Sequence, residues 1–207
     1  MFTTRLHVSA FAAITLLFAS NPVSAGLIDS RVTLQSQLGA AAIYEDFESW
    51  TSSIIDEPTL QVLDASTVVD GQGPGIVNPG LRFENLSIHR ENSYLQLDRR
   101  SQYNIPSGSI LGGNGGLLID FLWPVSHAGF DFFQFSGYAA SATIRVFASD
   151  DTTEIYFSPT LLDAPDAPAS TFFGYSNLDG IGSIRIESTG QVWSPLVDDL
   201  TYGGVPE

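Results

Sequence analysis

The sequence predicts an all-β protein: a two-sheet antiparallel β-sandwich of jelly-roll type, preceded by a cleavable signal peptide. From Ala42 onward, short runs rich in β-branched and aromatic residues alternate with clusters of Gly, Pro, Asn and Asp. Such runs with period two, bounded by turn residues, indicate strands, and helical periodicity is almost absent. Nine or ten short strands in one chain are typical of a two-layer sandwich or jelly roll.

The amino-terminal segment, residues 1–25, has the features of a secretory signal peptide. Arg5 and His7 precede an apolar run that ends near Ala19, and small residues before Gly26 form a cleavage site. A membrane-spanning helix needs about 20 consecutive apolar residues, and this run is shorter. We therefore expect export from a bacterium, to the medium or the cell surface, with no integral membrane span in the mature chain.

Three further segments follow the signal peptide. Residues 26–42 are expected to form a lead-in, either a strand or partly helical, because their apolar residues are mixed with small and polar ones. Residues 43–203 form the β-sandwich domain, which is long enough to build a sizeable core. Residues 204–207 are expected to be the remnant of a carboxyl-terminal sorting signal.

The strands of the domain are predicted from alternation and from the turns between them. The clearest is 142–148, where Ile144 and Val146 share one face with two alanines. The residues after it, 149–152, read as a hairpin turn. Long loops are expected at 71–80 and 161–170. The other strands are expected within 60–69, 80–90, 93–100, 115–123, 129–137 and 183–188.

The charge of the chain excludes some partners and favours others. Its 23 carboxylates face only 8 basic residues, all arginine, which gives a net charge of −15. Binding to nucleic acid depends on Lys and Arg neutralising phosphate, so we expect no nucleic-acid partner. Cysteine is absent, so disulfides, thiol nucleophiles and thiolate metal sites are excluded. The acidic balance is favourable for binding a divalent cation.

Two acidic clusters at opposite ends of the domain predict a structural calcium site. Glu45, Asp46 and Glu48 follow one strand end, and Asp198 with Asp199 lies in the last strand. The first and last strands of β-sandwiches are often neighbours, so both clusters could contribute to one ion. Calcium accepts six to eight oxygen ligands, including carboxylates and backbone carbonyls. Strand alternation allows only one of the two aspartates to bind through its side chain.

Two other interpretations of the same acids remain open. The acids could be solvated strand ends of a very acidic protein, with no ligand at all. Alternatively Glu45, Asp46 and Glu48 could provide the acid and base of a glycoside hydrolase or lyase, which work at carboxylate separations of about 5 to 9.5 Å. No second acidic motif supports catalysis, and no serine lies in a Gly-x-Ser-x-Gly elbow. We therefore expect a non-enzymatic protein.

Aromatic side chains are the candidates for ligand contact. An exposed Trp or Tyr ring can bury the C–H side of a sugar while polar neighbours bind its hydroxyls. We select Trp193, Tyr175 and Tyr94 as ligand-binding candidates, with packing in the core as the alternative for each. The other two tryptophans are Trp50 and Trp123.

The carboxyl-terminal part of the chain contains a series of short motifs: Phe172-Phe173-Gly174, Asp179-Gly180-Ile181, Ile184-Arg185-Ile186, Asp198-Asp199-Leu200, Tyr202-Gly203 and Val205-Pro206-Glu207. With these motifs, the chain resembles a group of secreted bacterial β-sandwich proteins that carry a PEP-CTERM sorting signal. Nearer the amino terminus, YEDFES and GLRFENL are similar to early strands of the same domains. The resemblance spans roughly residues 43–207, and its motifs are short.

This resemblance implies a jelly-roll or carbohydrate-binding-module-like fold, export through an inner membrane, and association with the cell surface or extracellular polysaccharide. The sequence departs from the sorting signal after Glu207, where the second proline, membrane helix and arginine cluster are missing. We therefore expect an exported, non-catalytic protein that binds carbohydrate or extracellular matrix and contains structural calcium. The first alternative is a matrix assembly protein without a small ligand. The second, which the sequence favours less, is a glycoside hydrolase or lyase.

Overall fold

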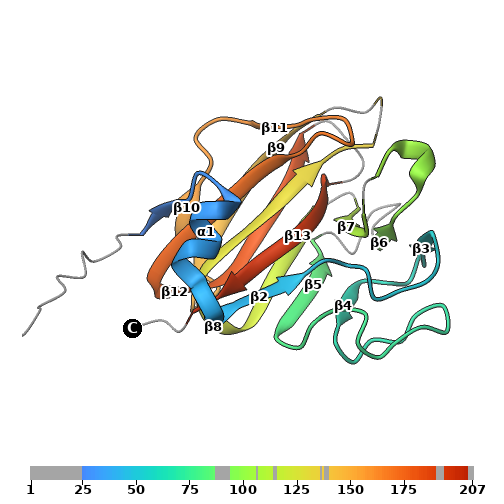
Figure 1. Cartoon of the computed structure of the whole chain (residues 1–207), viewed down its shortest axis with the longest axis horizontal. Coiled ribbons are helices and arrows are strands. Elements are labelled where there is room, and N and C mark those ends of the chain that lie inside the picture. The colour runs from blue at the N-terminus through green and yellow to red at the C-terminus, as the bar shows by residue number, and fades with distance from the viewer. Residues whose placement is uncertain are drawn as a thin grey trace, which may run out of the picture.

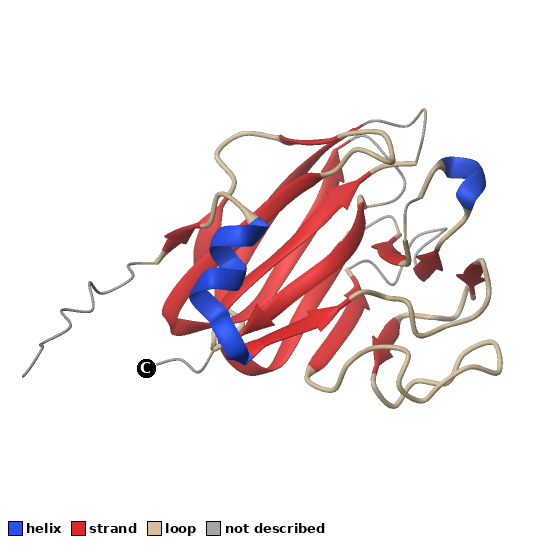
Figure 2. Ribbon diagram, in the orientation of Figure 1, coloured by secondary structure: helices blue, strands red, loops and turns tan. Residues whose placement is uncertain are grey.

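The computed structural model confirms the all-β antiparallel fold (Figures 1 and 2). It describes residues 25–86, 94–105, 107–113, 116–135, 137, 140–189 and 194–204. Residues 1–24 of the expected signal peptide and 205–207 of the expected sorting signal lie outside this range. No helix within the described range is long and apolar enough to span a membrane.

The described part of the chain contains thirteen strands and three short helical segments, joined by loops and turns. The strands are β1 (Gly26–Leu27), β2 (Ala42–Glu45), β3 (Ile54–Asp56), β4 (Val62–Asp64), β5 (Leu81–Asn85), β6 (Leu95–Asp98), β7 (Ser109–Gly112), β8 (Leu117–Phe133), β9 (Ala140–Ala148), β10 (Glu154–Phe157), β11 (Leu162–Ala164), β12 (Thr171–Thr189) and β13 (Leu196–Gly203). The helical segments are α1 (Arg31–Leu38), η1 (Gly39–Ala41) and η2 (Ser101–Tyr103).

The lead-in segment is partly helical, as one of the two sequence interpretations expected. Ser30 caps α1, because its hydroxyl accepts a hydrogen bond from the backbone N–H of Thr33 at 3.2 Å. Leu34 and Leu38 of the helix are buried and form a small apolar cluster with Ile28. Figure 1 shows α1 lying across the sheet, so the helix covers one of its faces.

Two long strands, β8 and β12, lie at the centre of the hydrogen-bonded ladder. The main path of hydrogen-bonded neighbours runs β10-β9-β12-β8-β13-β7-β6-β3. The first half of β8 pairs with β5 and its second half with β13, while β12 pairs with it on the other side. The ladder is therefore continuous through these strands, and β8 changes its partner on one edge along its length.

β8 is one continuous strand, so the prediction of two separate strands on either side of Pro124 is wrong. Proline lacks an N–H and normally interrupts a ladder, but it is tolerated at a bulge. The pairing of β8 with β12 is irregular here, because Asp120 is opposite Ser183 whereas Val125 is opposite Ile181. Pro124 lies within this irregular stretch, so the strand bends without ending.

Other differences from the expected strands concern their lengths. The strand expected at 60–69 is only β4, and the loop expected at 161–170 contains β11, which pairs with β9. The turn at 149–152 is confirmed.

The main hydrophobic core lies inside the sandwich. It contains tilted aromatic contacts such as that of Phe130 with Phe173, whose ring centroids are 5.5 Å apart.

The two ends of the domain meet in the sheet, as the sequence predicted. β2 pairs antiparallel with β13, and the pairing places Glu45 opposite Leu200 and Tyr44 opposite Thr201. The two acidic clusters therefore lie at the same seam, which is where the candidate metal site was expected.

Candidate functional site

The last strand has a bulge at its two aspartates. Its pairing with β8 shifts by one residue between Asp198 and Thr201, and Asp199 has a positive φ of 50°. Asp198 is 4% exposed while Asp199 is exposed. One aspartate is therefore buried and the other is exposed, as strand alternation predicts, and the bulge adds a local change in the direction of the strand.

Arg31 of α1 forms hydrogen bonds with residues of this bulge. Its guanidinium donates to the backbone carbonyl of Asp199 at 2.7 Å and to the hydroxyl of Thr201 at 3.1 Å. It also lies 3.0 Å from the carboxylate of Asp131 on β8. The helix thus supplies a positive charge at the place where three aspartates of β8 and β13 come close.

The carboxylate of Glu45 is bound by backbone donors. It accepts hydrogen bonds from the N–H of Phe47 at 2.9 Å and from the N–H of Asn78 at 2.6 Å. Burial raises the pKa of Glu45, and the hydrogen bonds from Asn78 and Phe47 act in the opposite direction. Glu45 therefore connects the end of β2 to the loop before β5.

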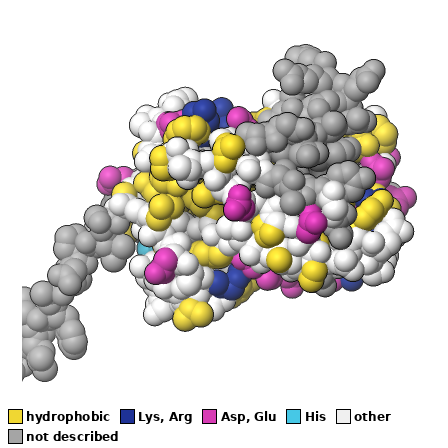
Figure 3. Space-filling model, turned by 90° about the horizontal axis from the view of Figure 1, so that it is seen from above, with side chains coloured by type: hydrophobic (Ala, Val, Ile, Leu, Met, Phe, Trp, Pro, Cys, Tyr) yellow, Lys and Arg dark blue, Asp and Glu magenta, His cyan; other side chains and the backbone are white. Residues whose placement is uncertain are grey.

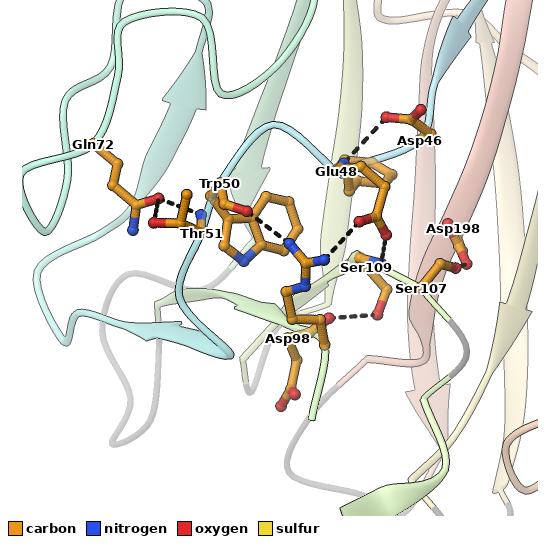
Figure 4. A network of polar contacts seen from close by, with 12 residues as sticks. Asp46, Glu48, Trp50, Thr51, Gln72, Asp98, Ser107, Ser109 and Asp198 are labelled. Carbon is orange, nitrogen blue, oxygen red and sulfur yellow. Dashed lines mark hydrogen bonds and ion pairs between the residues drawn. The ribbon is translucent and has the colours of Figure 1, made fainter. Parts of the chain in front are cut away.

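Glu48 and Asp198 meet on one short segment, Ser107 and Gly108 (Figure 4). Glu48 accepts from the N–H of Gly108 and pairs with Arg99 at 2.8 Å. Asp198 accepts from the hydroxyl of Ser107. A β-carbon on Gly108 would lie 1.9 Å from the carbonyl oxygen of Phe47, so only glycine permits this approach.

The environment of Asp198 changes its proton affinity. Burial raises the pKa of Asp198 to about 7. The hydrogen bond from Ser107 opposes this rise, whereas the negative charge of Asp199 adds to it. Asp198 thus titrates near neutral pH.

The structure brings Glu48 and Asp198 onto one segment but does not assemble the five predicted ligands around one position. Among the described residues, no group of three or more Asp, Glu or His side chains could hold a metal ion. Asp46 instead accepts from the N–H of Glu48 at 3.1 Å. On the face shown in Figure 3, carboxylates are spread out and not gathered into one patch. Calcium binding stays a prediction.

The three selected aromatic residues have different positions. Trp193 lies outside the described residues. Tyr175 is only 5% exposed, packs against Tyr156, and donates its hydroxyl to the carbonyl of Ile155 at 3.2 Å. It is part of the core, the alternative considered for it. Tyr94 is partly buried, and burial together with a hydrogen bond to Asp56 raises its pKa to about 12.

Trp123 presents its aromatic ring to a hollow at the surface. The hollow measures about 560 Å³ and lies at the corner of the sandwich. Trp123 is 48% exposed, and no burial in the core competes for its ring. The lining residues are Ala41, Ile43, Trp123, Pro124, Ser149, Asp179, Gly203 and Gly204.

The indole of Trp123 is supported by Gly80, the residue before β5. A β-carbon on Gly80 would lie 2.2 to 2.3 Å from two carbons of the six-membered ring. The carbonyl of Gly80 also accepts from the N–H of Leu122 at 3.0 Å, which fixes the strand beside it. The ring therefore rests directly on the backbone, and its position depends on a glycine with a φ of 95°.

Two polar side chains lie beside the apolar part of the hollow. Asp179 is presented by the bend of β12, where the amide of Asn177 donates to the carbonyl of Gly180 at 2.9 Å. Ser149 begins the turn between β9 and β10. An aromatic ring next to a carboxylate and a hydroxyl can bind one apolar face and several hydroxyl groups of a ligand.

Sequence reasoning missed Trp123 because it read the preceding run as one buried strand. The available signal was Leu-Trp-Pro in the middle of that run, since proline marks a bend where side chains leave the core. Nothing local in the sequence indicates that β2, β9, β12 and β13 all reach the same corner.

Comparison with known proteins adds two distant likenesses. No family model and no curated protein matches the chain. One solved structure, the CBM22-1 xylan-binding domain from Paenibacillus barcinonensis Xyn10C, has 12% identity and a TM-score of 0.39, and the match covers 80% of this chain and 94% of that chain. Another contains the CBM22-1 and GH10 modules of Clostridium thermocellum xylanase 10B with xylohexaose, at 13% identity and a TM-score of 0.38, and the match covers 59% of this chain and 26% of that chain. Both scores are below 0.5, so the fold rests on the strands described above.

Proposed function

We propose that this protein is an exported, non-catalytic β-sandwich that binds neutral carbohydrate at the hollow beside Trp123. One observation carries the proposal: a half-exposed indole lies over a hollow of about 560 Å³ with Asp179 and Ser149 at its side. Aromatic rings bury the C–H face of a sugar, and carboxylate and hydroxyl groups bind its hydroxyls. The partner would be an extracellular polysaccharide or matrix.

A neutral glycan suits the charge of the hollow. Its lining contains one carboxylate and neither Arg nor Lys, and the chain carries a net charge of −15. A carboxylate beside the ring would repel an acidic sugar and accept hydrogen bonds from a neutral one. Export rests on the predicted signal peptide, and attachment to the cell surface on the resemblance to sorting-signal proteins.

The test measures binding of xylohexaose and cellohexaose by calorimetry. We expect Trp123→Ala to weaken binding at least tenfold, about 1.4 kcal/mol, because it removes the stacking surface. Leu122→Ala is the matched control, since Leu122 is 56% exposed, adjacent in sequence, and not part of the lining. Equal binding by Trp123→Ala and the parent protein would contradict the proposal.

The alternative function, matrix assembly without a small ligand, predicts a different result. In that case no oligosaccharide would bind, and sedimentation velocity would show self-association that increases with protein concentration. The glycoside hydrolase interpretation is tested by Glu45→Gln, Asp46→Asn and Glu48→Gln. Full retention of any detected hydrolysis after these changes would rule out this cluster as the catalytic site.

A structural calcium ion is part of the same proposal and is tested separately. A ligand that binds only the native state raises the melting temperature. We therefore propose melting experiments with about 5 mM calcium and with excess chelator, because about 5 mM is roughly 50 times the tightest dissociation constant typical of extracellular calcium sites, about 0.1 mM. A common melting temperature in both conditions would exclude calcium and leave the carbohydrate site untouched.

A further inference from the structure

One arginine of the described chain differs from the others. Five arginines lie within 4.0 Å of a carboxylate: Arg31, Arg82, Arg99, Arg100 and Arg145. Arg185, in the middle of β12, forms no ion pair with any residue of the described ranges. In a chain with 23 carboxylates, an arginine without an acidic partner is unexpected.

The register of the sheet makes this arginine more unusual. Arg185 lies directly opposite Arg145 of β9, with Leu118 of β8 on its other side. Like charges at directly opposite positions destabilise a sheet. The charge of Arg145 is offset by Glu154 at 2.6 Å, so Arg185 is the one of the pair that has no counterion among the residues that the structure describes.

Both guanidinium groups are held in place by aromatic rings. Arg185 lies over the ring of Phe147 and Arg145 over the ring of Phe157, each with 4.4 Å from the guanidinium carbon to the ring centroid. The Nε atom of Arg185 is buried and has no hydrogen-bond partner within the described structure. Stacking restricts the side chain, so its planar fork of donors is ordered before any ligand arrives.

The acids on this part of the sheet define what kind of ligand could bind. Arg82 of β5 pairs with Glu84 on the same strand and with Asp120 of β8. Glu187 follows Arg185 two residues along β12. The surface is therefore of mixed charge and does not attract polyanions in general. A ligand would have to pair with the Arg185 fork directly, and a planar carboxylate matches its geometry with two parallel hydrogen bonds.

We propose that Arg185, with Arg145 beside it, binds a carboxylate group, supplied by a uronate unit of an acidic glycan. The bound carboxylate would separate the two facing guanidinium charges and supply the counterion that Arg185 lacks. This site lies on the paired strands β9 and β12 and uses none of the residues that line the hollow at Trp123. It does not depend on the function proposed above.

Calorimetry with tetragalacturonate at 0.15 M salt tests the proposal, because the Debye length of about 8 Å then suppresses long-range repulsion. We expect the parent protein to bind, Arg185→Gln to bind at least tenfold more weakly, and Arg185→Lys to lie between them. Arg82→Gln is the matched control, because it removes the same charge from an arginine that already has carboxylate partners. Its affinity should stay within threefold of the parent.

Further binding measurements identify the ligand and distinguish this site from the hollow at Trp123. The fully methyl-esterified tetramer should bind at least tenfold more weakly than the free acid, and Trp123→Ala should leave binding of the acid unchanged. Acetate that binds as tightly as the tetramer would overturn the assignment to a glycan and leave a site for a small carboxylate. No binding by the parent, or equal losses in Arg185→Gln and Arg82→Gln, would overturn the site itself.

Thermal melting without ligand checks that Arg185→Gln folds. It also tests whether the facing guanidinium groups of Arg185 and Arg145 repel each other. Since the facing guanidinium groups repel each other, the melting temperature of Arg185→Gln should be equal to or higher than that of the parent protein. A large decrease would mean that Arg185 stabilises the sheet by itself and needs no counterion.

Discussion

The protonation of Asp198 makes the stability of the domain depend on pH. Its pKa is about 7 in the folded protein against an ordinary value of 3.8. Because the folded state holds this proton more tightly than the unfolded chain, the stability from Asp198 is present below about pH 4 and is lost as the pH rises through about 7. This difference between the two pKa values corresponds to about 4 kcal/mol at most.

We therefore expect Asp198→Asn to be more stable than the parent protein at pH 8 and to show a flatter dependence of melting temperature on pH between 4 and 8. The amide can still accept from the N–H of Asp199, as the Oδ1 of Asp198 does at 2.7 Å. Ser107→Ala removes a hydrogen bond that lowers the pKa of Asp198, so its loss of stability should extend to higher pH. Parallel pH profiles for Asp198→Asn and the parent would contradict this explanation.

Gly80 tests whether the position of the Trp123 ring, and not only its presence, matters for binding. Alanine at this position would place a β-carbon within 2.3 Å of the indole, and it would also strain a backbone with a φ of 95°. We expect Gly80→Ala to melt at a lower temperature and to lose at least fivefold in affinity for xylohexaose. Gly75→Ala has a similar φ, of 93°, and nothing within 4 Å of the new carbon, so it should reproduce the lower stability without the loss of binding.

At the level of elements, α1 is stabilised by a cap and by burial, and not by strong helix propensity. Its eight residues are too few to form a stable helix alone, so tertiary contacts must hold it. Ser30→Ala removes the oxygen that accepts from Thr33, and we expect a loss of about 1 kcal/mol. This corresponds to roughly 2–4 °C in melting temperature for a domain of this size. Ser30→Asp, which keeps a capping oxygen, should restore the parent value.

The elements also show which features could be predicted from sequence. Alternation was sufficient for β9, because Ile144 and Val146 face the core while Arg145 faces away from it. It failed at β8, since a bend in a ladder depends on the pairing of Asp120 and Val125 with a distant strand. Periodicity describes one strand at a time, whereas bends arise between strands.

The candidate sites could be predicted only in part, because they too depend on contacts between distant strands. The sequence predicted that the acids of YEDFES and PLVDDL would meet at one seam, because the first and last strands of sandwiches are often neighbours, and β2 does pair with β13. It could not predict that Ser107 and Gly108 would supply donors to two of those acids. The hollow at Trp123 was missed because its lining comes from segments up to 163 residues apart, from Ala41 to Gly204.

At the scale of the whole molecule, the pairing of β2 with β13 joins the beginning of the domain to its end. Contacts so distant in sequence are slow to form, because the chain between them must be ordered first. We infer that this seam forms late in folding, after the long antiparallel pair of β8 and β12 has provided the strand on which β13 pairs.

This order predicts how truncated chains behave. A protein that begins at Gly39 lacks β1 and α1 and exposes the face that Leu34 and Leu38 cover, but it keeps β2 and should still fold at a lower melting temperature. A protein that begins at Asp46 also lacks β2, which leaves one edge of β13 open along Leu200–Gly203, although its other edge still pairs with β8. This truncation also removes Glu45 from the loop at Asn78. We expect the second protein to unfold without cooperativity or to aggregate through the open strand edge. Thermal unfolding by circular dichroism compares the two, and equal cooperative transitions would show that the seam is not needed for the fold.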